Sequence, residues 1–231
     1  MKSLLPTLHA LHLELLAAYG PQGWWPLLGH AGVNPTKTGS ITGYHPADYT
    51  FPRDEAQRFE ICTGAILTQN TAWPNVEKAL RALAEADALS PEAFLELPAL
   101  ELATRIRSAG YHNAKARKLK ELATFFRNLR GRAPTRNELL AVWGIGPETA
   151  DSIRLYAYRQ PEMVVDTYTR RVFERLGLVP APASYDALKA YCIANLPPEV
   201  VVYQEFHALI VEHAKRLKAS KAEDWARPVP G

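Results

Sequence analysis

The residues best suited to chemistry lie where a glycine-containing turn is followed by a carboxylate. Gly144 and Gly146 flank Ile145 between two helical patterns, and Asp166 opens another helical pattern. Glycines let backbone amides approach a phosphate, and the positive end of the second helix dipole favours an anion. The turn predicts a grip on a sugar-phosphate backbone. Taken alone, the turn can equally be an ordinary connection between two helices, and Asp166 can equally be a helix cap.

Two further blocks place polar and basic side chains at the ends of helical patterns. The first, FEICTGAILTQNTAW, runs over 59–73 and contains Gln69. The second, AGYHNAKARKLKEL, runs over 109–122 and contains Asn113. One face of the second block is basic, with Lys115, Arg117, Lys118 and Lys120. By themselves these features are a polar helix end and a solvated charged face.

Helical periodicity runs through most of the chain and positions these blocks. The first helix is predicted to begin near Leu4, and the helix after the turn to run from Pro147 to Tyr158. Residues 143–147 then form the turn of a helix-hairpin-helix. Residues that can cap or stop helices support these boundaries, namely Ser90, Thr135, Ser184 and Gly177.

The exception is 21–52, where glycines and prolines predict an irregular surface loop. No convincing strand pair and no fixed repeat is present. The sequence therefore predicts an all-α fold.

Composition places the chain among ordinary globular proteins. Its 231 residues are 47% hydrophobic and 22% charged, with a formal net charge of +3, which suits a nucleic-acid partner without requiring one. The two cysteines, Cys62 and Cys192, lie in separate apolar runs, which predicts buried thiols rather than a metal site. No stretch resembles a signal peptide or a membrane span, so we expect a cytoplasmic protein without membrane partners.

The turn and the carboxylate together resemble a known family. WGIGPETADSIRLYAYRQPEMVVDTYTRRV, starting at Trp143, resembles the helix-hairpin-helix and Gly/Pro-Asp signature of the endonuclease III superfamily of DNA glycosylases (HhH-GPD). Pro161 and Asp166 match the Pro and Asp of that signature. The resemblance implies two helical lobes with the active site in the cleft between them. It also implies that Asp166 is catalytic, stabilising positive charge on the sugar and helping to activate water.

The other two blocks match the same family in the same order. By this resemblance, Gln69 enters the duplex and fills the gap left by a flipped-out nucleotide. Asn113 and Lys115 are expected to contact the DNA backbone. The hairpin residues expected to bind DNA are Gly144, Ile145, Gly146 and Thr149.

Two differences separate the chain from bifunctional members of the family. At the position of the lysine that attacks the sugar stands Glu148, which cannot form an imine, so we expect a monofunctional enzyme without AP-lyase activity. The family's four cluster-binding cysteines are missing after His213, so we expect no iron-sulfur cluster and no required cofactor. The resemblance also implies that the hairpin carbonyls can hold a monovalent cation.

This combination is most similar to the iron-sulfur-free 3-methyladenine DNA glycosylases of the superfamily. The likeness implies base flipping and release of alkylated purines, which leaves an abasic site. Such bases are cationic, and each aromatic face that stacks on one is worth roughly 1–3 kcal/mol. The candidates for the base pocket are Trp24, Trp25, Tyr49, Phe51 and Trp73. Lys215 matches a lysine that relatives can carbamylate, and Glu212 and His213 are expected near it.

By the same resemblance, 57–163 is the lobe that carries the hairpin, and 1–56 with 164–231 form the second lobe. The expected partner is double-stranded DNA containing damaged bases, and the expected state is a monomer. Two alternatives remain: a glycosylase for mismatched thymine, for uracil or for oxidised bases, and a non-catalytic helix-hairpin-helix DNA-binding module. Defined lesions distinguish the enzymes, and a mere binding module has no need for Asp166.

Overall fold

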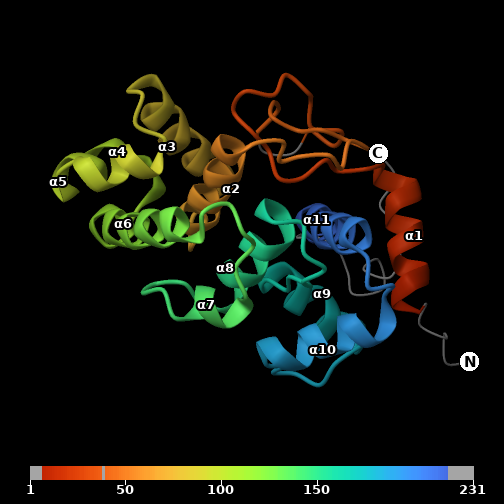
Figure 1. Cartoon of the computed structure of the whole chain (residues 1–231). Coiled ribbons are helices and arrows are strands. Elements are labelled where there is room, and N and C mark those ends of the chain that lie inside the picture. Colours follow the sequence, from red (N-terminus) through yellow and green to blue (C-terminus); the bar gives the residue numbers. More distant parts are fainter. Residues whose placement is uncertain (1–6, 38–39, 218–231) are drawn as a thin grey trace, which may run out of the picture.

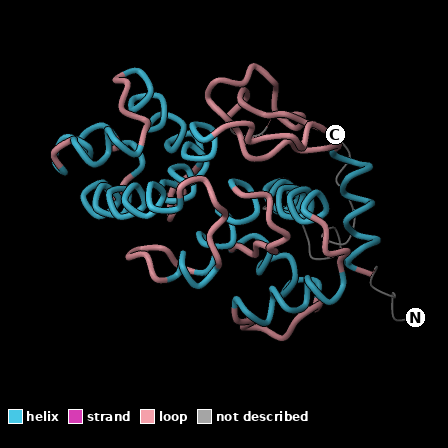
Figure 2. The backbone as a smooth tube through the Cα atoms, viewed as in Figure 1, coloured by secondary structure: helices cyan, strands magenta, loops and turns pink. Residues whose placement is uncertain are grey.

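The computed structural model describes residues 7–37 and 40–217, which fold into a helical protein (Figures 1 and 2). In these ranges the only strand-like pairing is an isolated bridge between Val33 and Thr42, so the all-α prediction is confirmed. The elements are α1 (Leu8–Tyr19), α2 (Glu55–Leu67), α3 (Trp73–Glu85), α4 (Pro91–Glu96), α5 (Ala99–Arg105), η1 (Arg107–Ala109), α6 (His112–Leu129), α7 (Arg136–Leu140), α8 (Pro147–Ser152), η2 (Ile153–Ala157), α9 (Thr167–Leu176), α10 (Tyr185–Asn195) and α11 (Val200–Arg216).

The helices form two groups that meet in the middle of the molecule (Figure 1). In one group α4 and α5 pack on α6, and α3 packs on α2. In the other, α11 packs on both α1 and α9. The η2 turn contacts α2 and α11, so it joins the groups, and the buried apolar core runs continuously through both. The division into lobes at 57 and 163 stays a prediction.

The predicted helix caps are present. Ser90 and Ser184 accept hydrogen bonds from the first turns of α4 and α10, and Thr135 forms a capping box with Glu138 at the start of α7. Gly177 ends α9 in the left-handed conformation, with a φ of 66°. These signals were readable from the sequence because a cap depends only on residues within one turn.

Two helices differ from prediction. α1 begins at Leu8, capped by Thr7, while Leu4 lies outside the described residues. The helix after the hairpin changes at Ile153 from α-helical to π-helical geometry. A π turn holds an extra residue, and here it carries Tyr156, whose hydroxyl lies 3.2 Å from the Gln204 carbonyl of α11.

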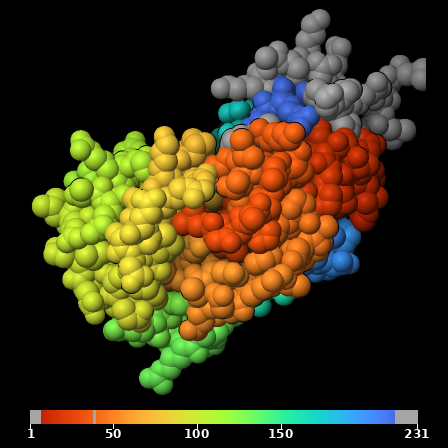
Figure 3. Space-filling model, turned by 90° about the horizontal axis from the view of Figure 1, so that it is seen from above, coloured from red at the N-terminus to blue at the C-terminus, as the bar shows by residue number. Residues whose placement is uncertain are grey.

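The loop between α1 and α2 is irregular, as predicted. Figure 3 shows it spread over one face of the molecule, between α1 and the α3–α5 side. In the part of the chain that the structure describes, no helix combines the length and the apolar character needed to cross a membrane.

Candidate active site

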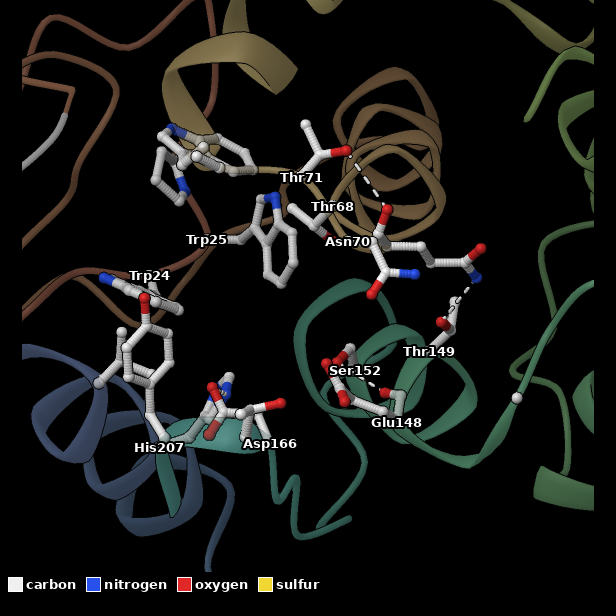
Figure 4. A pocket seen from close by; sticks show the side chains of 18 of the residues that line it. Trp24, Trp25, Thr68, Asn70, Thr71, Glu148, Thr149, Ser152, Asp166 and His207 are labelled. Atoms are coloured by element: carbon white, nitrogen blue, oxygen red, sulfur yellow. Dashed lines mark hydrogen bonds and ion pairs between the residues drawn. The ribbon is translucent and has the colours of Figure 1, made fainter. Parts of the chain in front are cut away.

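A cleft of about 930 Å³ is lined by residues from both groups of helices (Figure 4). The loop before α2, the α2–α3 connection, the hairpin, α9 and α11 all contribute to it. The predicted site residues that line it are Trp24, Trp25, Gln69, Trp73, Gly144, Gly146, Glu148, Thr149, Asp166 and Lys215. The cleft therefore brings most of the sequence-predicted residues together. Five others do not line it: Tyr49, Phe51, Asn113, Lys115 and Ile145.

Asp166 is the N-cap of α9, and it also lines the cleft. Its Oδ1 accepts hydrogen bonds from the backbone N–H of Thr169 at 2.8 Å and from its hydroxyl at 2.9 Å. Its Oδ2 lies 3.7 Å from Nε2 of His207. Burial alone would raise the pKa of Asp166, but His207 and Thr169 stabilise the carboxylate and hold the pKa below its usual value. An ionised carboxylate therefore faces the cleft at neutral pH.

His207, on α11, connects this carboxylate to the wall of the cleft. Its Nδ1 lies 2.7 Å from the hydroxyl of Tyr156, which is fully buried. Its ring packs edge-on against Trp24, with 5.5 Å between ring centroids. His207 therefore contacts both Asp166 and Trp24.

Glu148, on the first turn of α8, is exposed at the mouth of the cleft and is turned toward Asp166 (Figure 4). Partial removal from water and the negative charge of Asp166 raise the pKa of Glu148 to about 7, and His207 opposes this shift in part. The second carboxyl group of the cleft therefore changes its protonation state near neutral pH.

Three tryptophans form the aromatic wall of the cleft: Trp24, Trp25 and Trp73. The Trp25 ring meets Trp73 edge-on at 5.5 Å and Tyr156 at 5.3 Å between centroids. Tyr44 of the long loop also lines the cleft. Because Trp25 is mostly buried, it forms the back of the wall, while Trp24 and Trp73 are partly exposed.

The segment that carries Trp24 and Trp25 is fixed by buried side chains from both helix groups. Glu205 of α11 accepts a hydrogen bond from the backbone N–H of Gln22 at 2.8 Å, and Glu60 of α2 accepts one from Leu28 at 2.7 Å. His45 contacts the Trp25 carbonyl at 3.0 Å through Nε2. These contacts set the position of the aromatic wall.

Gly64 of α2 makes room for Trp25. A Cβ added at this position would lie 2.9 Å from Nε1 of the indole, closer than real Cβ atoms come to other heavy atoms. A glycine in the middle of a helix costs stability, and its use here is explained by the close approach of Trp25.

Gln69 follows α2 and bonds to the hairpin across the cleft. Its Nε2 donates to the Gly144 carbonyl and to the Thr149 hydroxyl, each at 3.0 Å. Its Oε1 accepts from Lys118 of α6 at 2.5 Å. In the absence of DNA, the amide of Gln69 is thus held against the hairpin.

The hairpin turn has the predicted glycine backbone, and Ile145 lies buried within it. Gly144 has a φ of 88°, a conformation that favours glycine, and a side chain there would collide with Lys118. Ile145 is buried, and its N–H donates to the Val142 carbonyl at 3.1 Å. Both the side chain and the amide of Ile145 hold the turn together, and its contact with DNA stays a prediction.

Lys115 uses its amine within the protein, and its contact with DNA stays a prediction. It is only 2% exposed, and its Nζ donates to the Leu67 carbonyl, the Thr71 hydroxyl and the Ala109 carbonyl at 2.7–2.8 Å. Burial and the nearby Lys118 lower its pKa to about 8. The amine satisfies carbonyl groups that the end of α2 and the η1 turn leave open. Asn113, two residues before Lys115, is exposed and lies outside the cleft.

The rest of the basic face of α6 is likewise used within the protein. Lys120 donates to the carbonyls of Leu95 and Leu97. Arg117 lies over the ring of Trp143, 4.0 Å from its centroid. The interpretation as a simply solvated face is therefore wrong.

Lys115→Met should lower the free energy of unfolding by about 2 kcal/mol or more, because it leaves buried carbonyls without a donor. The salt dependence of DNA binding should stay unchanged, whereas losing a phosphate contact would reduce its slope by about one. Urea unfolding and binding titrations at several salt concentrations measure both. Lys78→Met, at an exposed position on α3, is the control. A reduced salt slope with unchanged stability would show that Lys115 contacts DNA.

Phe51, a candidate for the base pocket, does not line the cleft. Its ring is buried in the long loop, against His45 at 4.6 Å and His30 at 5.0 Å between centroids. The loop folds back on itself, and this turns Phe51 inward. Tyr49 likewise does not line the cleft and instead interacts with Glu205.

Lys215 lines the cleft near the end of α11, as predicted. Removal from water lowers its pKa, and the charges of Glu212 and Asp166 partly offset the effect. Glu212 bonds to Arg216 at 2.8 Å, and His213 is buried with Nδ1 3.0 Å from the Tyr19 hydroxyl. Neither lines the cleft, so of these three only Lys215 faces it.

Several residues of the cleft were not predicted, and His207 is the most important of them. His207, Val211 and Lys215 all line the cleft from α11. They are spaced by four residues, which is the row on one helix face. Counting back from Lys215 would have found His207. Lys118, Tyr44 and Tyr185 gave no comparable signal.

Comparison with known proteins gives concordant matches. The model of the HhH-GPD superfamily of base excision DNA repair proteins matches residues 63–198. A Methanocaldococcus jannaschii protein that carries the name of a DNA repair glycosylase is 38% identical over 226 residues, covering 93% of this chain and 90% of its own.

Two solved structures are also similar. The Helicobacter pylori 3-methyladenine DNA glycosylase bound to 1,N6-ethenoadenine has a TM-score of 0.66 and 28% identity, covering 90% of this chain and 95% of its own. A trapped covalent intermediate of endonuclease III with DNA has a TM-score of 0.64 and 27% identity, covering 71% and 77%.

Proposed function

Because the chain belongs to the HhH-GPD superfamily of base excision DNA repair glycosylases, we propose that it is a monofunctional enzyme for alkylated purines. It hydrolyses the N-glycosidic bond of such a base in duplex DNA and leaves an abasic site. By the family resemblance, Asp166 is the catalytic carboxylate.

The observation that carries this proposal is Glu148 beside Asp166. Bifunctional relatives have a lysine at the position of Glu148, and its amine forms an imine with the sugar. A carboxyl group cannot form an imine, so transfer of the sugar to water is the reaction left. The cleft-lining lysines, Lys118 and Lys215, come from α6 and α11 rather than from the hairpin helix.

The preference for alkylated purines is supported by the walls of the cleft. A purine alkylated at N3 or N7 carries a positive charge and is already a good leaving group. Trp24 and Trp73 offer partly exposed aromatic faces, which attract cations, and Asp166 adds negative charge. The similar Helicobacter pylori protein is named for 3-methyladenine, and its structure contains 1,N6-ethenoadenine.

In the proposed reaction, the damaged nucleotide leaves the duplex and its base enters the cleft. The bond between C1′ and the base nitrogen breaks, and its electron pair neutralises the cationic base. Asp166 stabilises the positive charge that develops on the sugar. A water molecule then attacks C1′ and gives its proton to Asp166, so that the abasic sugar carries a hydroxyl group.

DNA binding is expected to use the hairpin and Gln69. Pro147 at the start of α8 has no N–H, so the first turn presents the backbone N–H groups of Glu148 and Thr149, which suit a phosphate. For Gln69 to fill the space of the flipped nucleotide, its bonds to Gly144 and Thr149 must be exchanged for bonds to DNA. The proposal includes an enzyme that works as a monomer. It also includes the absence of an iron-sulfur cluster, because Cys62 and Cys192 are too few for four thiolate ligands.

A panel of duplexes tests the proposed substrate. Each duplex carries one defined base: 3-methyladenine, 7-methylguanine, 1,N6-ethenoadenine, 8-oxoguanine, uracil opposite guanine, or thymine opposite guanine. We expect release of 3-methyladenine and 7-methylguanine at rates about tenfold or more above those of 8-oxoguanine, uracil and thymine, because only these two bases join positive charge to an aromatic ring. 1,N6-ethenoadenine is neutral, so its rate measures stacking without charge. Chromatography of the free bases measures this. Faster release of uracil, thymine or 8-oxoguanine would assign the enzyme to the alternative substrates.

A further inference from the structure

His207 touches Asp166 but has no part in the reaction described above. Its side chain is 5% exposed, and it lies on α11, far along the chain from the helix that Asp166 caps. Nε2 lies 3.7 Å from Asp166 Oδ2, and Nδ1 lies 2.7 Å from the hydroxyl of Tyr156. The three side chains form a continuous line from the cleft into the core.

The hydrogen-bond partners determine where the proton of His207 lies. The Tyr156 hydroxyl has one proton and two neighbours, His207 Nδ1 and the Gln204 carbonyl. If the hydroxyl donates to Nδ1, a neutral ring carries its proton on Nε2. If it donates to Gln204, Nδ1 must donate to the hydroxyl oxygen, and only a charged ring then has a proton on Nε2. A neutral ring in this second arrangement would turn a lone pair toward a carboxylate, which is repulsive.

Both favourable arrangements therefore point an N–H group from His207 toward Asp166. Thr169 already uses Oδ1, so Oδ2 is the oxygen that remains for His207 and for the sugar. A buried carboxylate without such partners tends to take up a proton. We propose that His207, held in place by Tyr156, is a positioning residue that keeps Asp166 ionised with Oδ2 available to the sugar.

This inference rests on the proposed role of Asp166 and concerns its protonation. Other charged groups also face this carboxylate. Glu148 of α8 opposes its ionisation, and Lys215 of α11 favours it. Behind Tyr156 lies the buried carboxyl group of Glu205. His207 differs from these groups because it contacts Asp166 within ion-pair distance.

Removing His207 has a consequence of definite sign. The pKa of Asp166 is held below its usual value by partners of the charged form, so it rises when such a partner is lost. At a given acid pH, less of the enzyme then has an ionised Asp166. The acid limb of the rate profile consequently moves toward higher pH.

The test measures single-turnover base release against pH at saturating enzyme, with whichever lesion the wild-type enzyme removes. We expect His207→Ala to move the acid limb upward by about one pH unit or more. His207→Gln should move it less, because an amide N–H replaces that of the ring. Tyr156→Phe keeps the aromatic ring at this position but removes the hydroxyl that contacts Nδ1 of His207, so it should shift the acid limb in the same direction. Tyr203→Phe, another fully buried tyrosine, should leave the limb unmoved.

Repeating the profiles with Glu148→Gln present removes the other carboxyl group that titrates in the cleft, and the shift should persist. Nitrogen NMR of the wild-type imidazole should show a proton on Nε2 at neutral pH. An acid limb that stays in place in both His207 variants, or an unprotonated Nε2, overturns the inference. A fully active Asp166→Asn enzyme instead overturns the proposed catalytic role on which it rests.

Discussion

Asp166→Asn should reduce base release by about a hundredfold to a thousandfold, because the amide lacks the charge that stabilises the developing sugar cation. Asparagine is as good an N-cap as aspartate, so α9 should remain folded. Affinity for a duplex that carries the lesion should be unchanged or higher. Single-turnover kinetics and equilibrium binding on the same duplex measure the two quantities separately.

The matched control is Asp54→Asn. Asp54 caps α2 in the same way, accepting from the N–H of Gln57 at 2.8 Å, but it is exposed and does not line the cleft. This variant should keep the wild-type rate. If Asp166→Asn retained full turnover, Asp166 would be only a helix cap.

The largest expected effect on stability is at Asp151, a fully buried carboxylate on α8. It bonds to Arg136 of α7 at 2.7 Å, to the Tyr185 hydroxyl at 2.6 Å and to Lys189 of α10 at 2.8 Å. Asp151→Ala should therefore lower the free energy of unfolding by about 3–5 kcal/mol, because it removes the carboxylate that Arg136 and Tyr185 bind and one of the two carboxylate partners of Lys189. Urea denaturation measures the change.

An exposed ion pair provides the comparison. Glu101 and Arg105 pair on the surface of α5 at 2.7 Å, one helical turn apart. Glu101→Ala should cost about 0.5 kcal/mol or less. Equal losses in the two variants would mean that the bonds around Asp151 do not hold the hairpin helix in place.

The parts of the site that the sequence predicted correctly depend on neighbours in the chain. Asp166 as an N-cap, the Gly144 turn and the start of α8 at Pro147 are each determined within one helical turn. The family resemblance added the link between hairpin and carboxylate. It also pointed to Trp24, which the structure places in the cleft.

The differences from expectation concern tertiary contacts, which the pattern of a single helix does not reveal. A lysine on a basic face suggests a surface residue, yet Lys115 reaches the carbonyls of Leu67 and Ala109. Phe51 is turned inward by the fold of its own loop. His207 was missed because one histidine in an apolar helix does not reveal that the packing of α11 places it next to Asp166. The four-residue spacing from Lys215 places His207 on the cleft face of α11, but its contact with Asp166 depends on how the helices pack.

The most direct test of the proposed function is a single reaction with a duplex that contains 3-methyladenine, analysed for free base, strand integrity and trapping by borohydride. The account predicts release of free base and an abasic strand that stays intact until it is treated with alkali. Borohydride should trap no enzyme–DNA adduct, because it reduces an imine and Glu148 cannot form one. An adduct that forms with wild-type enzyme and disappears on changing Lys215 or Lys118, the lysines of the cleft, would contradict the account.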